Sequence, residues 1–200
     1  PGLRRSSLAQ DLADYVDRSG ARAIRVDCFE GERSSPLQPL ITVLSQLLLL
    51  NAPDRLTRLL GSWADTALEL VPDLRDVIGP LEYQRASPEI EHQRILNTMR
   101  HVLASASEEQ PLLLFFDDLH LAGTATIEAL LWLLHNLGGA PLLVVATAPS
   151  DRLDEELRAL ADRGLLVELG PLTESEVAQL AAQAGVAATR PSCGSSPWGS

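Results

Sequence analysis

The sequence predicts an α/β fold with a mainly parallel, layered sheet. Two segments, Leu112–Phe116 and Pro141–Thr147, are apolar runs without a polar interruption. Such runs are typical of strands that helices cover on both faces. Segments with helical spacing and helix start and stop signals alternate with these runs. Alternation of strands and helices favours a parallel sheet over hairpins.

Composition limits the classes of protein to which the chain can belong. The 200 residues are 46% apolar and carry a net charge of −11. That charge argues against direct nucleic-acid binding, which needs clustered Lys and Arg. Cys28 and Cys193 lie far apart, so we expect neither a disulfide framework nor a metal site from them, and a cytoplasmic location. Neither a membrane-length apolar run nor a signal-peptide pattern is present, so we expect no membrane contact.

The first half of the chain contains helices around one short strand. Helical spacing begins at Leu8 and ends before Gly20, and the apolar segment Ala23–Val26 is a strand that leads into Asp27. Leucine-rich helical segments follow, and then a Pro/Gly-marked connection over Pro72–Pro88. The expected helices cover Leu8–Arg18, Pro36 or Pro39 to Leu50, Arg55–Leu60, Ser62–Leu70 and Pro88–Ser107, the last with Ile90, Ile95, Met99, Val102 and Leu103 facing inward.

The second half repeats the strand and helix alternation. We expect Leu165–Leu169 to be a last short strand, and the Thr173/Glu176 spacing predicts a capping box. From Gly185 onward the small, polar composition predicts disorder. The expected helices run from Gly123 or Thr124 to Leu137, from Ser150 or Asp151 to Arg163, and from Thr173 to Ala184.

Two adjacent acids, Asp117 and Asp118, follow the apolar strand Leu112–Phe116 directly. They would stand at the carboxyl end of that strand, where open α/β sheets bind ligands. P-loop ATPases use such carboxylates to hold magnesium and to orient the attacking water. The alternative is a core strand followed by a polar turn.

Several segments together resemble the AAA-like ATPase module of the STAND class, found in large LuxR-type bacterial regulators. The resemblance covers residues 1–184 and depends on the order of Pro1–Leu8, Leu112–His120, Leu142–Thr147 and Glu168–Leu172. It implies a three-layer, mainly parallel P-loop NTPase (AAA-like) sheet that lacks the strand before the P-loop. The implied organisation is an AAA-like core over residues 1–171, the start of a helical lid over 172–185 and a disordered tail over 186–200.

By this resemblance, the phosphate loop lies at the N-terminus. A working loop reads G-x-x-x-x-G-K-[ST], with backbone N–H groups and a Lys on the phosphates and a hydroxyl on magnesium. The resemblance places Arg4 at the second glycine and Arg5 at the lysine. Its implied nucleotide-binding residues here are Gly2, Arg5, Ser6 and Ser7, with Ser6 also on Mg²⁺. A side chain at the glycine position, and a planar guanidinium for a Lys, predict weak or absent hydrolysis.

The same resemblance assigns roles farther along the chain. Asp117 would bind Mg²⁺ and Asp118 would act as the catalytic residue that polarises water. Thr147 would end the sensor strand at the nucleotide, although the family's following Arg is missing here. Pro171 would pack near the nucleotide at the lid junction, with plain turn punctuation as its alternative. His120 matches a frequent family histidine, with a cap or turn residue as its alternative.

The family's strand order predicts which strands become neighbours. Leu112–Phe116 should lie between Ala23–Val26 and the strand that ends at Thr147, with Leu165–Leu169 beside them, loosely held or re-paired. The leading hypothesis is therefore an ATP- and Mg²⁺-binding switch whose partners are C-terminal or partner regulatory domains. The alternatives are a non-catalytic α/β scaffold or a truncated gene product. The candidate contact surface of such a scaffold is Leu47–Leu50, although we expect this segment to pack into the core.

Overall fold

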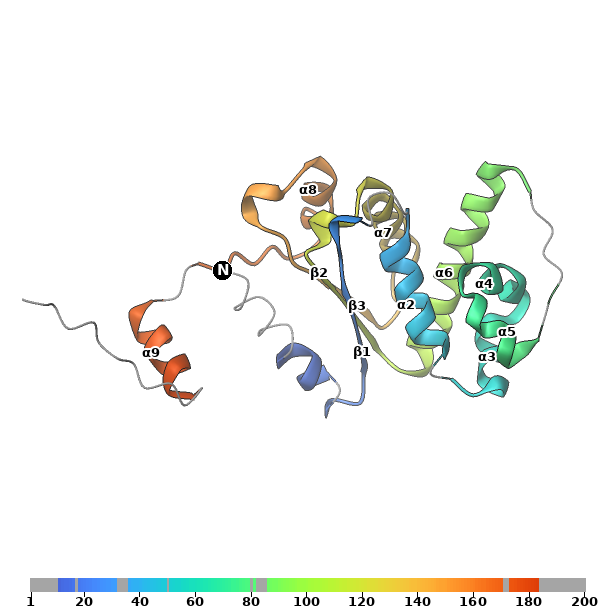
Figure 1. The fold of residues 1–200 in the computed structure, drawn as a ribbon, viewed down its shortest axis with the longest axis horizontal. Coiled ribbons are helices and arrows are strands. Elements are labelled where there is room, and N and C mark those ends of the chain that lie inside the picture. Colours follow the sequence, from blue (N-terminus) through green and yellow to red (C-terminus); the bar gives the residue numbers. More distant parts are fainter. Residues whose placement is uncertain are drawn as a thin grey trace, which may run out of the picture. The chain divides into compact units, whose positions relative to one another are not determined.

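A computed structural model describes residues 11–16, 18–31, 36–49, 51–79, 81, 86–170 and 173–183. The chain divides into two compact units, which are treated separately below. The larger unit covers Gly2–Leu166, and the smaller one comprises Pro1 with Val167–Ser200. The described part of the larger unit holds the sheet and the helices around it (Figure 1).

Three parallel strands form the described sheet, in the order β1-β2-β3. They are β1 (Arg22–Asp27), β2 (Leu112–Asp117) and β3 (Leu142–Ala146). Every residue of β2 is buried, as expected for a strand with neighbours on both sides and helices nearby. The predicted α/β class and the predicted order of these strands are therefore confirmed.

The expected strand Leu165–Leu169 is wrong. Those residues have no regular secondary structure, and Leu165 is 89% exposed. An apolar, β-branched composition suits a strand only where an adjacent strand pairs with its backbone. β3 pairs with β2 on one side, and no described strand pairs with its other side.

The described helices follow the predicted alternation, with three differences. The helix expected over Ser62–Leu70 starts as a 3₁₀ turn, and the α-helix begins at Ala64. The connection after Pro72 contains a 3₁₀ turn and a short helix, and the helix expected from Ser150 is split into a 3₁₀ turn and a later helix. Asp154 caps that later helix, because its side chain accepts a hydrogen bond from the Leu157 N–H at 3.0 Å. The helices are α2 (Gln38–Leu49), α3 (Pro53–Leu60), α4 (Ala64–Leu70), α5 (Arg75–Ile78), α6 (Pro88–Glu109), α7 (Thr124–Asn136) and α8 (Glu155–Ala161); the turns are η2 (Gly61–Trp63), η3 (Pro72–Leu74), η4 (Leu119–Leu121) and η5 (Ser150–Arg152).

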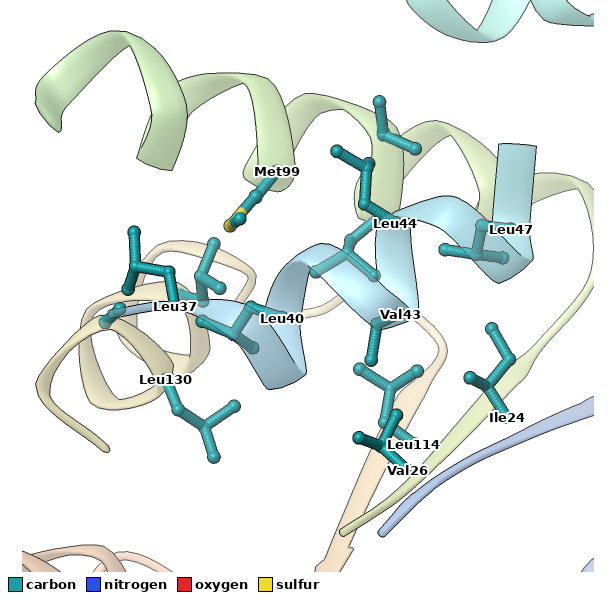
Figure 2. Close-up of a cluster of buried hydrophobic side chains, with 14 of the residues drawn as sticks. Ile24, Val26, Leu37, Leu40, Val43, Leu44, Leu47, Met99, Leu114 and Leu130 are labelled. Atoms are coloured by element: carbon teal, nitrogen blue, oxygen red, sulfur yellow. The ribbon is translucent and has the colours of Figure 1, made fainter. Parts of the chain in front are cut away.

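One face of the sheet packs against α2, which in turn contacts α6 and α7 (Figure 2). Alternate strand residues point to this face, as the period of a strand requires; they include Ile24, Val26 and Leu114. Met99 from α6 and Leu130 from α7 belong to the same buried cluster. A void of only about 10 Å³ remains where α2, α6 and α7 meet, so the core is closely packed.

One expectation about an apolar side chain needs correction. Ile90 was expected to face inward, but it is 53% exposed because it lies in the first turn of α6, before the buried residues of that helix begin. Leu47 and Leu48 are fully buried, which agrees with the expectation that the segment Leu47–Leu50 packs into the core. The other residues expected inward on α6 are partly or fully buried: Ile95, Met99, Val102 and Leu103.

The smaller unit contains one described helix, α9 (Glu174–Gln183). Its start confirms the predicted capping box, because the Thr173 N–H donates to Glu176 Oε2 at 2.7 Å and the Glu176 N–H donates back to Thr173 Oγ1 at 3.4 Å. Ala184 and the predicted disordered tail lie outside the described residues. Among the helices that the structure describes, none combines the length and apolar character needed to cross a membrane.

Candidate functional site

The polar groups of interest lie at the carboxyl edge of the sheet. Because the strands are parallel, Asp27 at the end of β1, Asp117 at the end of β2 and Thr147 just after β3 reach the same edge. Asp27 and Asp117 are direct partners in the strand register. This edge is where open α/β sheets place their ligand sites.

Asp117, Asp118 and Thr147 form one hydrogen-bonded unit. The Thr147 hydroxyl donates to Asp117 Oδ1 at 2.5 Å and accepts from the Asp118 N–H at 2.9 Å. The backbone of Thr147 is also fixed, since its N–H donates to the Phe116 carbonyl and its carbonyl accepts from the Leu119 N–H, both at 2.9 Å. One hydroxyl therefore holds both acidic residues in place and ties β2 to the segment after β3.

Asp118 turns the chain away from the strand. Its backbone is left-handed, with φ 53° and ψ 45°, a conformation that Asp tolerates better than most residues. The turn leads into η4, and the Asp118 side chain remains half exposed. Its carboxylate therefore projects toward solvent, whereas the Asp117 side chain, at 12% exposure, is nearly buried.

Arg25 completes the site, and the sequence analysis missed it. Its guanidinium donates through Nε to Asp27 Oδ1 and through a terminal nitrogen to Asp117 Oδ2, both at 2.9 Å. It also lies over the Phe115 ring, 5.6 Å from the ring centroid. The available signal was the Arg25/Asp27 spacing of two residues, which places both side chains on one face of a strand.

His120 lies close to this unit, but its ring nitrogen is not within hydrogen-bond distance of the Asp118 carboxylate. Its Nδ1 is 3.9 Å from Asp118 Oδ1, beyond hydrogen-bond distance. The side chain belongs to η4 and is 13% exposed, which agrees with the interpretation of His120 as a turn residue. Arg152, which follows β3, is exposed in η5.

The structure thus brings together three of the predicted site residues, Asp117, Asp118 and Thr147. The other predicted residues lie outside the described part of the chain, and their roles stay predictions. They are Gly2, Arg5, Ser6, Ser7 and Pro171.

As arranged, the described residues do not fit a divalent metal ion. Both Asp117 oxygens already accept hydrogen bonds, one from Thr147 and one from Arg25. Within the described ranges, no three His, Cys, Asp or Glu side chains are grouped so that they could hold a metal ion. A metal that bound Asp117 through Oδ2 would compete with the guanidinium for that oxygen, because a carboxylate oxygen cannot serve both cations at full strength.

Comparisons with known proteins agree with this geometry at the level of the family. The family model described as "AAA ATPase domain" matches residues 1–145, which include the predicted phosphate loop, β1, β2 and nearly all of β3. Neither the search of curated proteins nor the search of solved structures found a match. The family match covers well over half of the sequence, and on this basis the chain belongs to the AAA ATPase domain family.

Proposed function

We propose that the chain is an ATP-binding regulatory module that acts as a switch, of the STAND class found in LuxR-type signalling and transcriptional regulators, with weak or no hydrolysis. Membership of the AAA ATPase domain family supports nucleotide binding, since that family generally binds ATP with Mg²⁺. In such a switch, contacts to the γ-phosphate bias the packing of attached domains. The proposed partners are therefore the nucleotide and C-terminal or partner regulatory domains.

The observation that carries the proposal is the Asp117–Thr147–Asp118 unit at the carboxyl edge of a parallel sheet. A buried acid, a hydroxyl at the end of the next strand and a projecting acid are the groups that phosphoryl-transfer sites place beside a nucleotide. In the proposal Thr147 contacts the nucleotide, and Asp118 is the residue that would orient water. The phosphates would bind to the loop at Gly2, Arg5, Ser6 and Ser7, and Pro171 would contact the nucleotide from the lid junction.

Weak or absent hydrolysis is proposed for two reasons. Arg4 stands where the phosphate loop needs a glycine, and Ala148-Pro149 follow Thr147 where the family often has an arginine. Positioned cations stabilise the charge that develops on the transferred phosphoryl group. Arg25 is the cation closest to the acids in the described site, and it is held by Asp27 and Asp117.

Thermal unfolding with millimolar ATP tests the proposal. Wild type should be stabilised, because a ligand that binds only the folded state raises the free energy of unfolding. Arg5→Ala should lose this stabilisation. Arg4→Gly is the matched variant at the neighbouring arginine, and it should keep or increase the stabilisation, since it removes a side chain where the backbone must approach the phosphates. Wild type that ATP leaves unchanged would overturn the proposal.

The scaffold alternative receives less support from the structure. Its candidate contact surface was Leu47–Leu50, and Leu47 and Leu48 are buried in the core. Leu49 is partly exposed, and Leu50 lies outside the described residues. A single exposed leucine is ordinary on a protein surface and does not indicate a docking site.

A further inference from the structure

The Arg25 guanidinium bridges two carboxylates from neighbouring strands. It contacts Asp27 Oδ1 and Asp117 Oδ2 at the same distance of 2.9 Å. The strand register explains the bridge, because Asp27 pairs with Asp117 while Arg25 pairs with Phe115, one step back on the same face. The Phe115 ring beneath the guanidinium restricts it further.

The two carboxylates differ in how strongly they need this cation. The Asp27 side chain is 53% exposed, so water can solvate it, and an ion pair at that exposure contributes little. The Asp117 side chain is 12% exposed and its other oxygen is occupied by Thr147. A nearly buried carboxylate is costly unless a cation or hydrogen bonds compensate its charge. Arg25 is therefore the cation that the described structure places on this nearly buried carboxylate.

The position of Arg25 is also the position that a metal ion shared by the two acids would occupy. The guanidinium donates to Asp117 Oδ2 while the Thr147 hydroxyl donates to Oδ1, so a divalent cation on Oδ2 would compete with Arg25. Two in-register carboxylates on adjacent strands could share one ion, because neighbouring strands lie only about 5 Å apart. The guanidinium fills that space, and the three groups together carry a net charge of −1, whereas the two carboxylates alone carry −2.

We propose that Arg25 is the resident counter-cation of Asp117, competes with divalent metal ions for its carboxylate, and lets this site hold its charge without Mg²⁺. The proposal deepens the proposed function, because it concerns the metal requirement of the same site. It predicts that removing Arg25 converts Asp27 and Asp117 into a divalent-cation site.

Titration with Mg²⁺ or Mn²⁺ alone tests this proposal without nucleotide. Thermal unfolding of the full chain is followed at matched ionic strength for wild type, Arg25→Gln, Arg25→Gln with Asp117→Asn, and Arg22→Gln. Arg22 is the matched control, since it lies on the same strand but at the amino end and on the opposite face. Failure of the nucleotide proposal appears in the ATP experiment and leaves this readout intact.

Arg25→Gln should lower the melting temperature, and Mg²⁺ should restore part of the loss. The apparent affinity for Mn²⁺ should rise by about tenfold or more over wild type, which corresponds to removal of one competing charge contact. The double variant and Arg22→Gln should show no such gain. Equal metal affinity of wild type and Arg25→Gln would overturn the proposal, as would a gain that persists without the Asp117 carboxylate.

A second variant keeps the test decisive if Arg25→Gln does not fold. Arg25→Lys retains one positive charge, but an ammonium lacks the planar fork that bridges both acids. Its Mn²⁺ affinity should lie above that of wild type, and Asp117→Asn in the same background should remove the gain. Affinity equal to that of wild type in Arg25→Lys would contradict competition at Asp117.

Discussion

At the scale of single residues, Thr147 forms hydrogen bonds with both acidic residues of the site. Its hydroxyl donates to one acid and accepts from the backbone of the next, so it fixes the relative positions of Asp117 and Asp118. Arg25 plays the complementary part by compensating the Asp117 charge from the neighbouring strand. The two contacts hold Asp117 from opposite sides, which gives the buried acid one defined orientation.

Replacement of the Thr147 hydroxyl tests that unit. Thr147→Val keeps the shape of the side chain but leaves an Asp117 oxygen and the Asp118 N–H without this partner. Urea unfolding should show a loss of about 1–3 kcal/mol, the usual cost of leaving a buried polar group unsatisfied. Thr147→Ser retains the hydroxyl and should lose much less. Equal losses for Val and Ser would show that the hydroxyl does not carry the contact.

Replacement of Asp118 separates its backbone role from its proposed role toward water. Asp118→Ala should destabilise the fold by about 1 kcal/mol, because Ala is disfavoured in the left-handed region, whereas Asp118→Gly should match or exceed wild type. Chemical unfolding midpoints give the comparison. If Ala and Gly variants are equally stable, the left-handed turn after β2 is not formed.

Some residues of the site were predictable from the sequence, and one was not. Asp117, Asp118 and Thr147 were predictable as neighbours, because each follows an apolar strand and adjacent parallel strands end at one edge. Arg25 was not predicted, since its importance depends on the register that sets it beside Phe115 and below Asp117. A register between segments about ninety positions apart has no local signal.

At the scale of elements, α2 and α6 form the centre of the core. Leu44 and Leu47 from α2, and Met99 from α6, are almost fully buried, and the adjoining void is only about 10 Å³. Helical periodicity predicted Met99 among these positions, together with Ile95, Val102 and Leu103 on the same helix. It failed at Ile90, because periodicity identifies a face of a helix and not how far along that face the core extends.

Truncation of a core side chain on α6 tests this arrangement. Met99→Ala should lower the free energy of unfolding by about 2–5 kcal/mol, since the removed atoms leave a cavity that tight packing cannot refill. Ile90→Ala, on the same helix but exposed, should change stability by less than about 0.5 kcal/mol. Urea denaturation measures both. Similar losses at the two positions would contradict the assigned face of α6.

β3 differs from β2 because its outer edge has no described strand beside it. Along a parallel strand, every second residue directs its backbone N–H toward the same neighbouring strand. The Thr147 N–H donates to the Phe116 carbonyl, so the Val145 N–H also faces β2 and the Val144 N–H faces away from it. Strands at an edge expose such groups to water or to another strand. The exposed Leu143 side chain belongs to the same strand.

Proline substitution distinguishes the two sides of β3. Val145→Pro removes a ladder hydrogen bond and should cost about 3 kcal/mol or more, whereas Val144→Pro should cost clearly less, because its N–H faces away from β2. Thermal or urea unfolding provides the comparison. An equal cost at both positions would mean that both sides of β3 are paired.

At the scale of the whole molecule, the larger unit is a parallel sheet with helices around it and a polar carboxyl edge. The α/β class and the strand order were predictable, because uninterrupted apolar strands and the family resemblance specify them together. The irregular structure of Leu165–Leu169 was not predictable, since a strand forms only where a neighbouring strand pairs with its backbone. The sequence shows the apolar run but not whether a neighbour exists.

The most direct test of nucleotide binding at this edge is amide NMR chemical-shift mapping with ATP. Cys28, Asp118 and Thr147 follow the carboxyl ends of the three strands, while Arg22, Leu112 and Leu142 begin them. ATP should shift the first group and leave the second nearly unchanged, so each strand provides its own control. Shifts confined to the amino ends, or none at millimolar ATP, would contradict a nucleotide site at the carboxyl edge.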